Sequence, residues 1–221
     1  MRYLQLEPLV GYGLVGDRAV FLDLRRDRYF SLDPSCEHAF QELREAPEPV
    51  LSAGPHREAL LATGLFRASA LRVRLAAADP ARPTLSLLDE TARAGLRLRA
   101  AWRAWRAVKR ARRRLTTVPI AQIARDIREA RYAVPPQGDA SVAEDAARSF
   151  VGARAIVPVE RGCLLDSLAL IDWLGEDAGH AQLVFGVSLD PFRAHCWLQT
   201  ERLLLTDAHD TVGTFVPVLS V

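Results

Sequence analysis

Hydrophobic and polar positions alternate along the first part of the chain as they do in short β-strands. Three such runs are rich in β-branched and aromatic residues, and they cover residues 11–15, 19–23 and 28–31. Turn-forming residues separate the runs, because Gly16-Asp17 and the charged segment 25–27 favour tight turns. The pattern therefore predicts three strands joined by short turns.

The following segment changes to helical periodicity. Asp33 and Pro34 supply an N-cap and a first-turn proline, which predict a helix running to about Arg44. A second short helix is expected from His56 to a stop at Gly64. Three small strands followed by helices indicate a compact, winged-helix-like α+β domain over residues 1–75.

Residues 76–83 are rich in alanine and proline and show no periodicity, which predicts a linker. Beyond it, a second α+β domain is expected over residues 84–221, with helices first and an antiparallel sheet last. Trp102 and Trp105 continue an apolar stripe and are expected to anchor one helix in the core. Residues 141–144 form a capping-box pattern at the start of a later helix.

An almost uniformly apolar segment predicts the central helix of this second domain. Residues 163–174 are hydrophobic nearly all round, which is typical of a helix at the centre of a domain. Strands are expected to follow at residues 181–189, 194–200 and 203–207, and a last apolar run covers residues 215–221.

Composition narrows the class of protein. The chain has 221 residues, of which 49% are hydrophobic and 25% are charged, as is ordinary for a soluble globular protein. No apolar run approaches the roughly 20 residues that span a bilayer. Glu7 lies where a signal peptide would be apolar, so we expect a cytoplasmic protein without membrane association.

Ten basic residues and no acidic one lie between Arg93 and Arg114, although the formal net charge of the whole chain is only +2. A solvated helix face is the default interpretation. The alternatives are a docking surface for a partner protein or an acidic peptide, and nucleic-acid binding. The basic run lies outside the winged-helix-like unit, which argues against nucleic acid as a partner.

The three cysteines, Cys36, Cys163 and Cys196, lie far apart and form no CxxC pair. This spacing argues against a disulfide framework and against a structural zinc site, so we expect free thiols and no cofactor. A catalytic metal site made of His195, His209 and Cys163 lacks two ligands close together on one element.

Three residues at the edges of predicted elements suit acyl-transfer chemistry. Cys163 follows Gly162 at the start of the apolar helix, where the helix dipole lowers the pKa of a thiol. His195 begins a strand, and Asp207 ends the next one. A nucleophile beside a base that a carboxylate orients is the arrangement of a catalytic triad. His209 and Asp210 are rivals for the last two roles, and Cys163 as a simple core residue is the competing interpretation.

The predicted hairpin sets a geometric condition for this triad. A three-residue loop centred on Glu201 would place His195 directly opposite Asp207. A two-residue loop would instead pair Asp207 with Cys196, on the other face of the strand. The triad therefore predicts an odd-length loop or a bulge. Cys196 alternates with His195 and is expected to lie in the core, as is Cys36.

Two motifs resemble a known family. The segment RGCLLDSLAL at 161–170 resembles the nucleophile helix of lasso-peptide maturation proteases, which are cysteine proteases of the transglutaminase-like fold. The segment FRAHCWLQ at 192–199 resembles their histidine strand, and Thr206-Asp207 resembles their acid. Asp166 departs from the family where many members carry arginine, and Cys196 stands in place of a small residue.

This resemblance implies a papain/transglutaminase-like fold for residues 84–221 and a leader peptidase activity. Cys163 would be the nucleophile, His195 the base and Asp207 the residue that orients it. The implied partners are a ribosomal precursor peptide and an ATP-dependent lasso cyclase that closes a macrolactam on the freed amine. Two alternatives remain: an acyltransferase of the same fold, and a non-catalytic adaptor that binds a leader or nucleic acid.

The N-terminal unit resembles the PqqD-like recognition elements of ribosomal peptide biosynthesis. The resemblance implies that a leader peptide adds a strand to the sheet edge, so that backbone hydrogen bonds supply affinity and pockets supply selectivity. The docking edge would be the strand of Arg28, Tyr29, Phe30 and Ser31. The helix facing it would contribute Leu60, Leu61 and Leu65.

Overall fold

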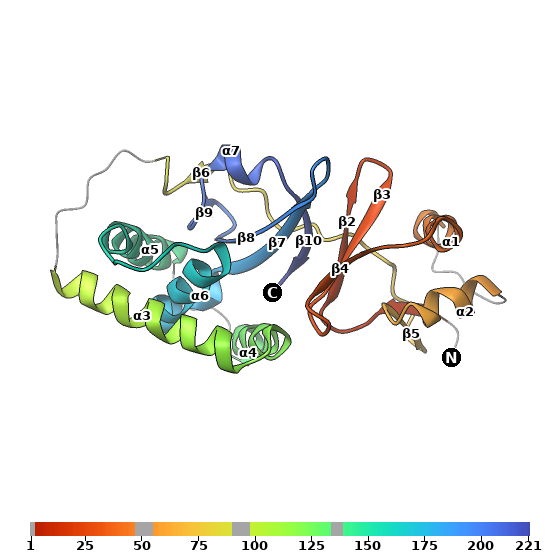
Figure 1. Ribbon diagram of the computed structural model, residues 1–221, viewed down its shortest axis with the longest axis horizontal. Coiled ribbons are helices and arrows are strands. Elements are labelled where there is room, and N and C mark those ends of the chain that lie inside the picture. Colours follow the sequence, from red (N-terminus) through yellow and green to blue (C-terminus); the bar gives the residue numbers. More distant parts are fainter. Residues whose placement is uncertain (1–2, 47–54, 90–97, 134–138) are drawn as a thin grey trace. The chain divides into compact units, whose positions relative to one another are not determined.

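The computed structural model describes residues 3–46, 55–89, 98–133 and 139–221 (Figure 1). Tertiary contacts divide the chain into two compact units. One is Met1–Asp79 with Val216–Leu219, and the other is Pro80–Phe215 with Ser220–Val221. The boundary after Asp79 lies inside the segment that the sequence predicts as a linker.

The N-terminal unit contains two small sheets and two helices. Its elements are β1 (Tyr3–Leu6), β2 (Val10–Val15), β3 (Arg18–Asp23), β4 (Arg28–Ser31), α1 (Pro34–Glu45), α2 (Pro55–Ala62) and β5 (Phe66–Ser69). Strands β2, β3 and β4 form an antiparallel sheet in that order, as the alternating pattern predicts. The sequence did not predict β1 and β5, which pair with each other although they lie near opposite ends of the unit's sequence.

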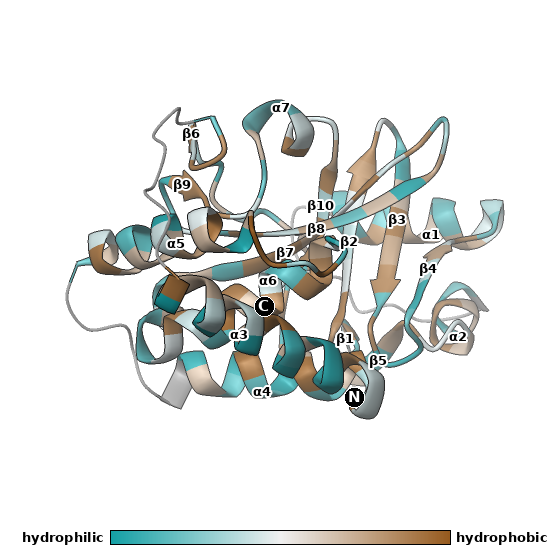
Figure 2. Cartoon of the chain, turned by 60° about the vertical axis from the view of Figure 1, so that its left-hand side comes forward, coloured by the Kyte–Doolittle hydropathy of each residue, from teal (hydrophilic) through white to brown (hydrophobic). Residues whose placement is uncertain are grey.

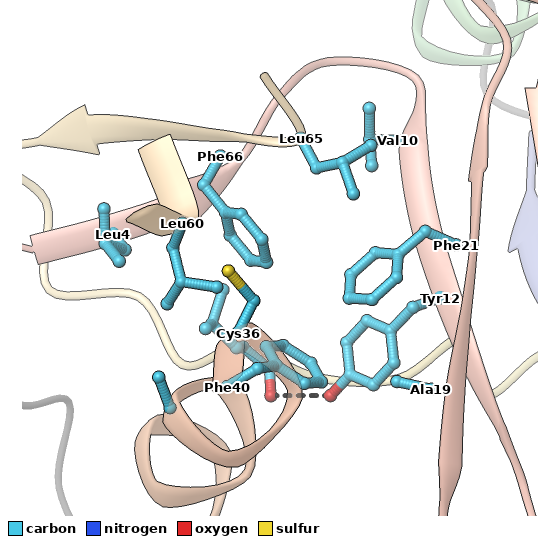
Figure 3. Packing of buried hydrophobic residues seen from close by; sticks show 12 residues of the cluster. Leu4, Val10, Tyr12, Ala19, Phe21, Cys36, Phe40, Leu60, Leu65 and Phe66 are labelled. Carbon is cyan, nitrogen blue, oxygen red and sulfur yellow. Dashed lines mark hydrogen bonds between the residues drawn. The ribbon is translucent and has the colours of Figure 1, made fainter. Parts of the chain in front are cut away.

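Aromatic rings fill the core of this unit (Figure 3). Phe40 of α1 meets Tyr12 and Phe21 with ring centroids 4.9 and 5.1 Å apart, both edge to face. The Tyr12 hydroxyl donates to the carbonyl oxygen of Leu75 at 3.1 Å, so its polar end is satisfied inside the core. Cys36 lies in the same cluster, which confirms it as a core residue.

A buried carboxylate fixes the turn between β3 and β4. Asp23 is fully buried and accepts from the backbone N–H, Nε and Nη2 of Arg25 at 2.9, 2.9 and 2.8 Å. Arg25 Nη2 also donates to the carbonyl of Gly64, and Arg26 Nη1 donates to that of Thr63. The two arginines therefore tie this turn to the end of α2, where Gly64 adopts the left-handed conformation that ends the helix.

The second unit places helices before a mixed sheet. Its elements are β6 (Leu85–Ser86), α3 (Leu98–Thr117), α4 (Ile120–Ala133), α5 (Ala140–Arg154), α6 (Cys163–Leu174), the 3₁₀-helix η1 (Gly175–His180), β7 (Gln182–Ser188), β8 (Arg193–Gln199), β9 (Leu203–Leu204) and α7 (His209–Val212). The last strand, β10 (Val216–Ser220), belongs to the same sheet, although the contacts group its residues Val216–Leu219 with the first unit. The sheet order is β10-β7-β8-β9-β6. The pairs β7–β8 and β8–β9 are antiparallel as predicted, whereas β6 adds a parallel edge beside β9.

Helix α6 is the central helix that its composition predicts. It packs against α3, α5 and β8 (Figures 1 and 2). Its buried residues face more than one direction and include Leu168, Leu170 and Trp173, because neighbours surround it on several sides. Its first residue, Cys163, nevertheless remains exposed to solvent.

The prediction that Trp102 and Trp105 anchor α3 in the core is wrong. Their exposed fractions are 59% and 40%, and the cations of Arg106 and Lys109 lie over their rings. The buried face of α3 consists of small residues instead, namely Ala104, Ala107, Val108 and Ala111. Small side chains allow packed helices to approach each other closely. In the sequence the large tryptophans dominate the hydrophobic pattern, so the face made of small residues is not recognised as the buried one.

The capping prediction for α5 is displaced by two residues. The helix begins at Ala140, and its N-cap is Asp139, whose carboxylate accepts from the backbone N–H of Ser141 at 3.0 Å. Aspartate and serine are equally good N-caps. The sequence therefore offers both Asp139 and Ser141 as possible starts of this helix.

Candidate active site

The nucleophile candidate lies at the open N-terminus of α6. Gly162 is the N-cap and has an extended backbone, and no side chain caps the first turn. The first N–H groups of the helix are therefore directed toward the region of Cys163, and the positive end of the helix dipole favours an anionic sulfur there. The carboxylate of Asp166, in the same turn, binds Arg154.

A buried arginine holds the segment that leads to Cys163. Arg154, at the end of α5, is only 3% exposed, and its Nε lies 2.7 Å from Oδ1 of Asp166. Its Nη1 and Nη2 donate to the carbonyls of Val157 and Glu160, both at 3.2 Å. One side chain therefore ties the connection between α5 and α6 to the first turn of α6. The sequence offers no signal for this contact, because arginine is common throughout the chain.

The histidine and aspartate of the predicted triad meet. Nε2 of His195, on β8, lies 2.7 Å from Oδ1 of Asp207, and both side chains are about one-sixth exposed, at 17% and 15%. The ring of His195 also stacks near those of Trp197 and Phe215. With Nε2 engaged by the aspartate, Nδ1 is the ring nitrogen left for Cys163.

The meeting of His195 and Asp207 does not come from an odd-length loop, and that prediction is wrong. Strand β9 pairs Gln199 with Leu204, the register in which Cys196 would lie opposite Asp207. However, β9 ends at Leu204, and the chain bends over residues 205–207. This bend, and not the predicted bulge, turns Asp207 toward His195.

Two hydroxyl groups hold Asp207. Thr206 Oγ1 donates to Oδ2 of Asp207 at 2.8 Å and accepts the backbone N–H of Leu198 at 2.9 Å. Ser86, on the β6 edge strand, donates from its Oγ to the backbone carbonyl of Asp207 at 2.7 Å. The sequence places Thr206 beside the acid, but a contact with Ser86 across more than 100 residues has no sequence signal.

The electrostatics favour a thiolate–imidazolium pair. Hydrogen bonds from Cys196 and His195 lower the pKa of Cys163 to about 4. Hydrogen bonds to Asp207 and Cys163 raise the pKa of His195 to about 9. Between these values the sulfur carries a negative charge and the imidazole a positive one, which is the activated state of a cysteine nucleophile.

The prediction that Cys196 is a core residue is confirmed, but it is incomplete. It is 3% exposed, as expected of a core residue. Hydrogen bonding to Cys163 and burial both raise the pKa of Cys196 well above its usual range. The prediction of a purely structural role for Cys196 left out this contact.

The acid that His195 contacts is Asp207 and not the rival Asp210. His209 and Asp210 are exposed and begin the short helix α7. The backbone N–H of His209 donates to the carboxylate of Asp89 at 3.2 Å. Within the described part of the chain, no group of three or more His, Cys, Asp or Glu residues is arranged to hold a metal ion.

The predicted leader-binding residues divide by exposure. Arg28 and Ser31 of β4 are exposed, and Tyr29 and Phe30 are half-buried. Leu60 and Leu65 are buried in the aromatic core, whereas Leu61 is partly buried against it, as is Phe30. Leu60 and Leu65 therefore support the surface of this unit and do not line it.

A model of the transglutaminase-like superfamily matches residues 91–220, which is more than half of the chain, and the protein belongs to that superfamily. Comparison with curated proteins and with solved structures found no match. Across the described ranges, no helix has the length and hydropathy needed to cross a membrane.

Proposed function

We propose that this protein is a leader peptidase of lasso-peptide maturation, which hydrolyses the bond between leader and core of a ribosomal precursor. The observation that carries the proposal is the site at the start of α6. Cys163 is exposed, hydrogen bonds from Cys196 and His195 lower its pKa, and Nε2 of His195 lies 2.7 Å from Oδ1 of Asp207. The motifs around these residues, which resemble those of lasso-peptide maturation proteases, supply the substrate class.

The reaction begins from the thiolate–imidazolium pair. The Cys163 thiolate attacks the carbonyl carbon at the leader–core junction, and the Nδ1–H of His195 protonates the leaving amine. The core peptide departs with a free amino group, and the leader remains as a thioester on Cys163. His195 then takes a proton from water, which attacks the thioester and releases the leader as a carboxylic acid.

The open N-terminus of α6 suits the developing oxyanion. The backbone N–H of Cys163 lies in the first turn, where no side-chain cap occupies the helix end. A preorganised N–H group at this position is worth about 3 kcal/mol in acyl transfer. The helix dipole acts in the same direction.

We propose that the N-terminal unit binds the leader along β4. This strand pairs with β3 on one side, and none of the described strands pairs with its other side. Phe30 and Leu61 lie half-buried on the same core cluster, so they offer apolar contact to an added strand. A separate ATP-dependent cyclase would then use the freed amine of the core peptide.

Mass spectrometry of a precursor peptide encoded beside this gene, incubated with the protein and its cyclase, tests the proposal. We expect cleavage at one junction by the natural chain. Cys163→Ala, His195→Ala and a leader-deleted precursor should each abolish it or slow it at least 10²-fold. Equal cleavage by Cys163→Ala would refute the nucleophile, and binding of precursor without cleavage by any form would support an adaptor.

An acyltransferase is the second candidate, because the superfamily includes transglutaminases as well as cysteine peptidases. Both begin with the same thioester, and they differ in whether water or an amine accepts the leader. A primary amine added to the reaction separates them. A peptidase yields the leader mainly as an acid, whereas a transferase yields the leader amide at low amine concentration.

A further inference from the structure

An arginine lies beside the histidine of the candidate site. Arg193 begins β8, and His195 follows it two residues later, so both side chains lie on the same face of the sheet. Two residues of extended strand place their Cα atoms about 7 Å apart. Arg193 is exposed, whereas His195 is partly buried. A cation therefore lies on the solvent side of the residue that would act as base.

Phe215 contacts both of these side chains. Its ring centroid lies 5.1 Å from that of His195 and 5.2 Å from the guanidinium carbon of Arg193. The ring has room because Gly186, which pairs with His195 from β7, has no side chain. A Cβ atom at that glycine would lie 2.8 Å from the ring of Trp197 and 3.1 Å from Cβ of Phe215. One aromatic ring therefore joins the cation to the imidazole.

The guanidinium of Arg193 is fixed in place, yet most of its donors are unused. Its Nε donates to Oγ of the buried Ser188 at 3.2 Å, across the β7–β8 pair. Among the described residues, neither of its Nη groups has a hydrogen-bond acceptor, and no carboxylate forms an ion pair with it. A guanidinium presents its N–H groups as a planar fork that matches a carboxylate. The exposed Nη groups are therefore available to an anion from outside the chain.

We infer that Arg193 is a specificity-determining residue of this site, which binds an acidic side chain of the substrate next to the bond that is cleaved. The inference rests on the proposed function, because it assigns a preference to the peptide that Cys163 would cleave. Arg193 takes no part in the proton transfers, so its loss should slow the cleavage of acidic peptides and spare neutral ones. An arginine that only supported Phe215 would affect both kinds of peptide equally.

Alkylation of Cys163 tests the cation without any peptide. Iodoacetate is an anion and iodoacetamide is its neutral counterpart, so the ratio of their rate constants reports the charge near the sulfur, while changes in thiolate reactivity cancel. We expect Arg193→Gln to lower this ratio about threefold at low ionic strength, and high salt should reduce the difference. Peptide mass spectrometry under reducing conditions follows the modification of Cys163.

Arg202→Gln is the matched control, because it removes an exposed cation beyond the other end of β8 and changes the net charge by the same amount. It should leave the ratio unchanged. Equal ratios in Arg193→Gln and the natural chain would overturn the inference. Equal decreases in the two variants would also overturn it, because they would reflect the net charge of the protein and not a cation at the site.

Precursor cleavage then tests the preference itself. Precursors that carry Glu or Gln at each of the two positions on either side of the junction should reveal at least one position where Glu raises kcat/KM about tenfold. Arg193→Gln should abolish this preference and cleave the Gln precursors as fast as the natural chain does. Cleavage without any preference for Glu would overturn the inference and leave the peptidase standing. A lowered iodoacetate ratio without cleavage of any precursor would support anion binding by Arg193 and refute the peptidase.

Discussion

At the scale of single residues, the hydrogen bond from His195 to Asp207 decides how the imidazole can act. A carboxylate only accepts hydrogen bonds, so Nε2 carries the hydrogen in the neutral ring and Nδ1 is left with a lone pair. That lone pair is the only site on the ring that can take the proton of Cys163. The orientation of the ring thus follows from the bend that positions the carboxylate.

The pKa values of Cys163 and His195 predict a bell-shaped pH dependence of precursor cleavage. As the pH falls through about 4, Cys163 is protonated and the nucleophile is lost. As it rises through about 9, His195 loses the proton that the leaving amine needs. We expect kcat/KM to be nearly constant between these limits. Alkylation of Cys163 should stay high above pH 9, because it needs only the thiolate, and a parallel fall of both reactions would contradict this assignment.

Thr206 is expected to act through Asp207. Thr206→Val removes the donor to Oδ2 and leaves the N–H of Leu198 without its acceptor. We expect kcat to fall about tenfold with KM little changed, and stability to fall by about 1–2 kcal/mol. Thr206→Ser keeps the hydroxyl and should restore kcat. Steady-state kinetics of the two variants make the comparison, and equal kcat for valine and serine would rule out an orienting role.

At the scale of elements, the ion pair of Arg154 and Asp166 joins α5 to α6. Arg154→Met should lower the free energy of unfolding by about 3–5 kcal/mol, because it strands a carboxylate that is only 15% exposed. Arg148→Met on the same helix removes a cation whose ion pair with Asp145 is exposed, and should cost less than about 1 kcal/mol. Urea unfolding measures both.

The double variant of Arg154→Met with Asp166→Leu separates charge from packing. Replacing both partners by apolar residues should recover most of the lost stability, since no unpaired charge is left buried. If the double variant is as unstable as Arg154→Met alone, the loss comes from the contacts of the guanidinium with the carbonyls of Val157 and Glu160.

Helix α3 shows where a hydrophobic pattern misleads. Trp102→Ala should cost less than about 1 kcal/mol, because the ring is largely exposed and loses mainly its contact with Arg106. Ala107→Leu should cost about 1–3 kcal/mol, because the alanine is fully buried and a larger side chain overpacks the helix contact. Thermal or urea unfolding of the two variants would reverse this order if the tryptophans were the core face.

Local signals in the sequence were sufficient for most elements. Asp33 and Pro34 begin α1, Gly64 ends α2, and the apolar composition after Gly162 marks the central helix. The sequence also predicted that His195 and Asp207 would meet, which the structure confirms, whereas the catalytic roles of Cys163, His195 and Asp207 stay a prediction.

What the sequence could not supply depends on long-range contacts. The pairing of β1 with β5 joins segments about 60 residues apart. The bend after Leu204 depends on Thr206 capturing the N–H of Leu198 and on Ser86 capturing the carbonyl of Asp207. Without knowledge of those partners, strand alternation alone predicts the wrong loop between β8 and β9.

At the scale of the whole molecule, the two units offer different chemistry. The N-terminal unit presents β4 as a strand edge over an aromatic core, and its thiol, Cys36, is buried. The second unit carries Cys163 and His195. If binding and chemistry are divided in this way, changes in the first unit should alter affinity for the precursor without altering the reactivity of the thiolate.

Phe30 tests this division, because it lies half-buried on β4 and packs on the core cluster. Phe30→Ala should raise KM for the precursor about tenfold or more, as expected for loss of an aromatic anchor. The value of kcat at saturation and the rate of Cys163 alkylation should both stay as they are. A leader-deleted precursor should be cleaved equally slowly by this variant and by the natural chain.

Leu14→Ala is the matched control. Leu14 is also partly buried against the same cluster, but it lies on β2, at the opposite edge of the sheet β2-β3-β4. Its loss of apolar contact should lower stability to a comparable degree while KM for the precursor stays unchanged. Equal increases of KM in both variants would mean that the N-terminal unit contributes only stability. A selective increase for Phe30→Ala would locate the leader on β4, because only an occupant of that edge distinguishes the two substitutions.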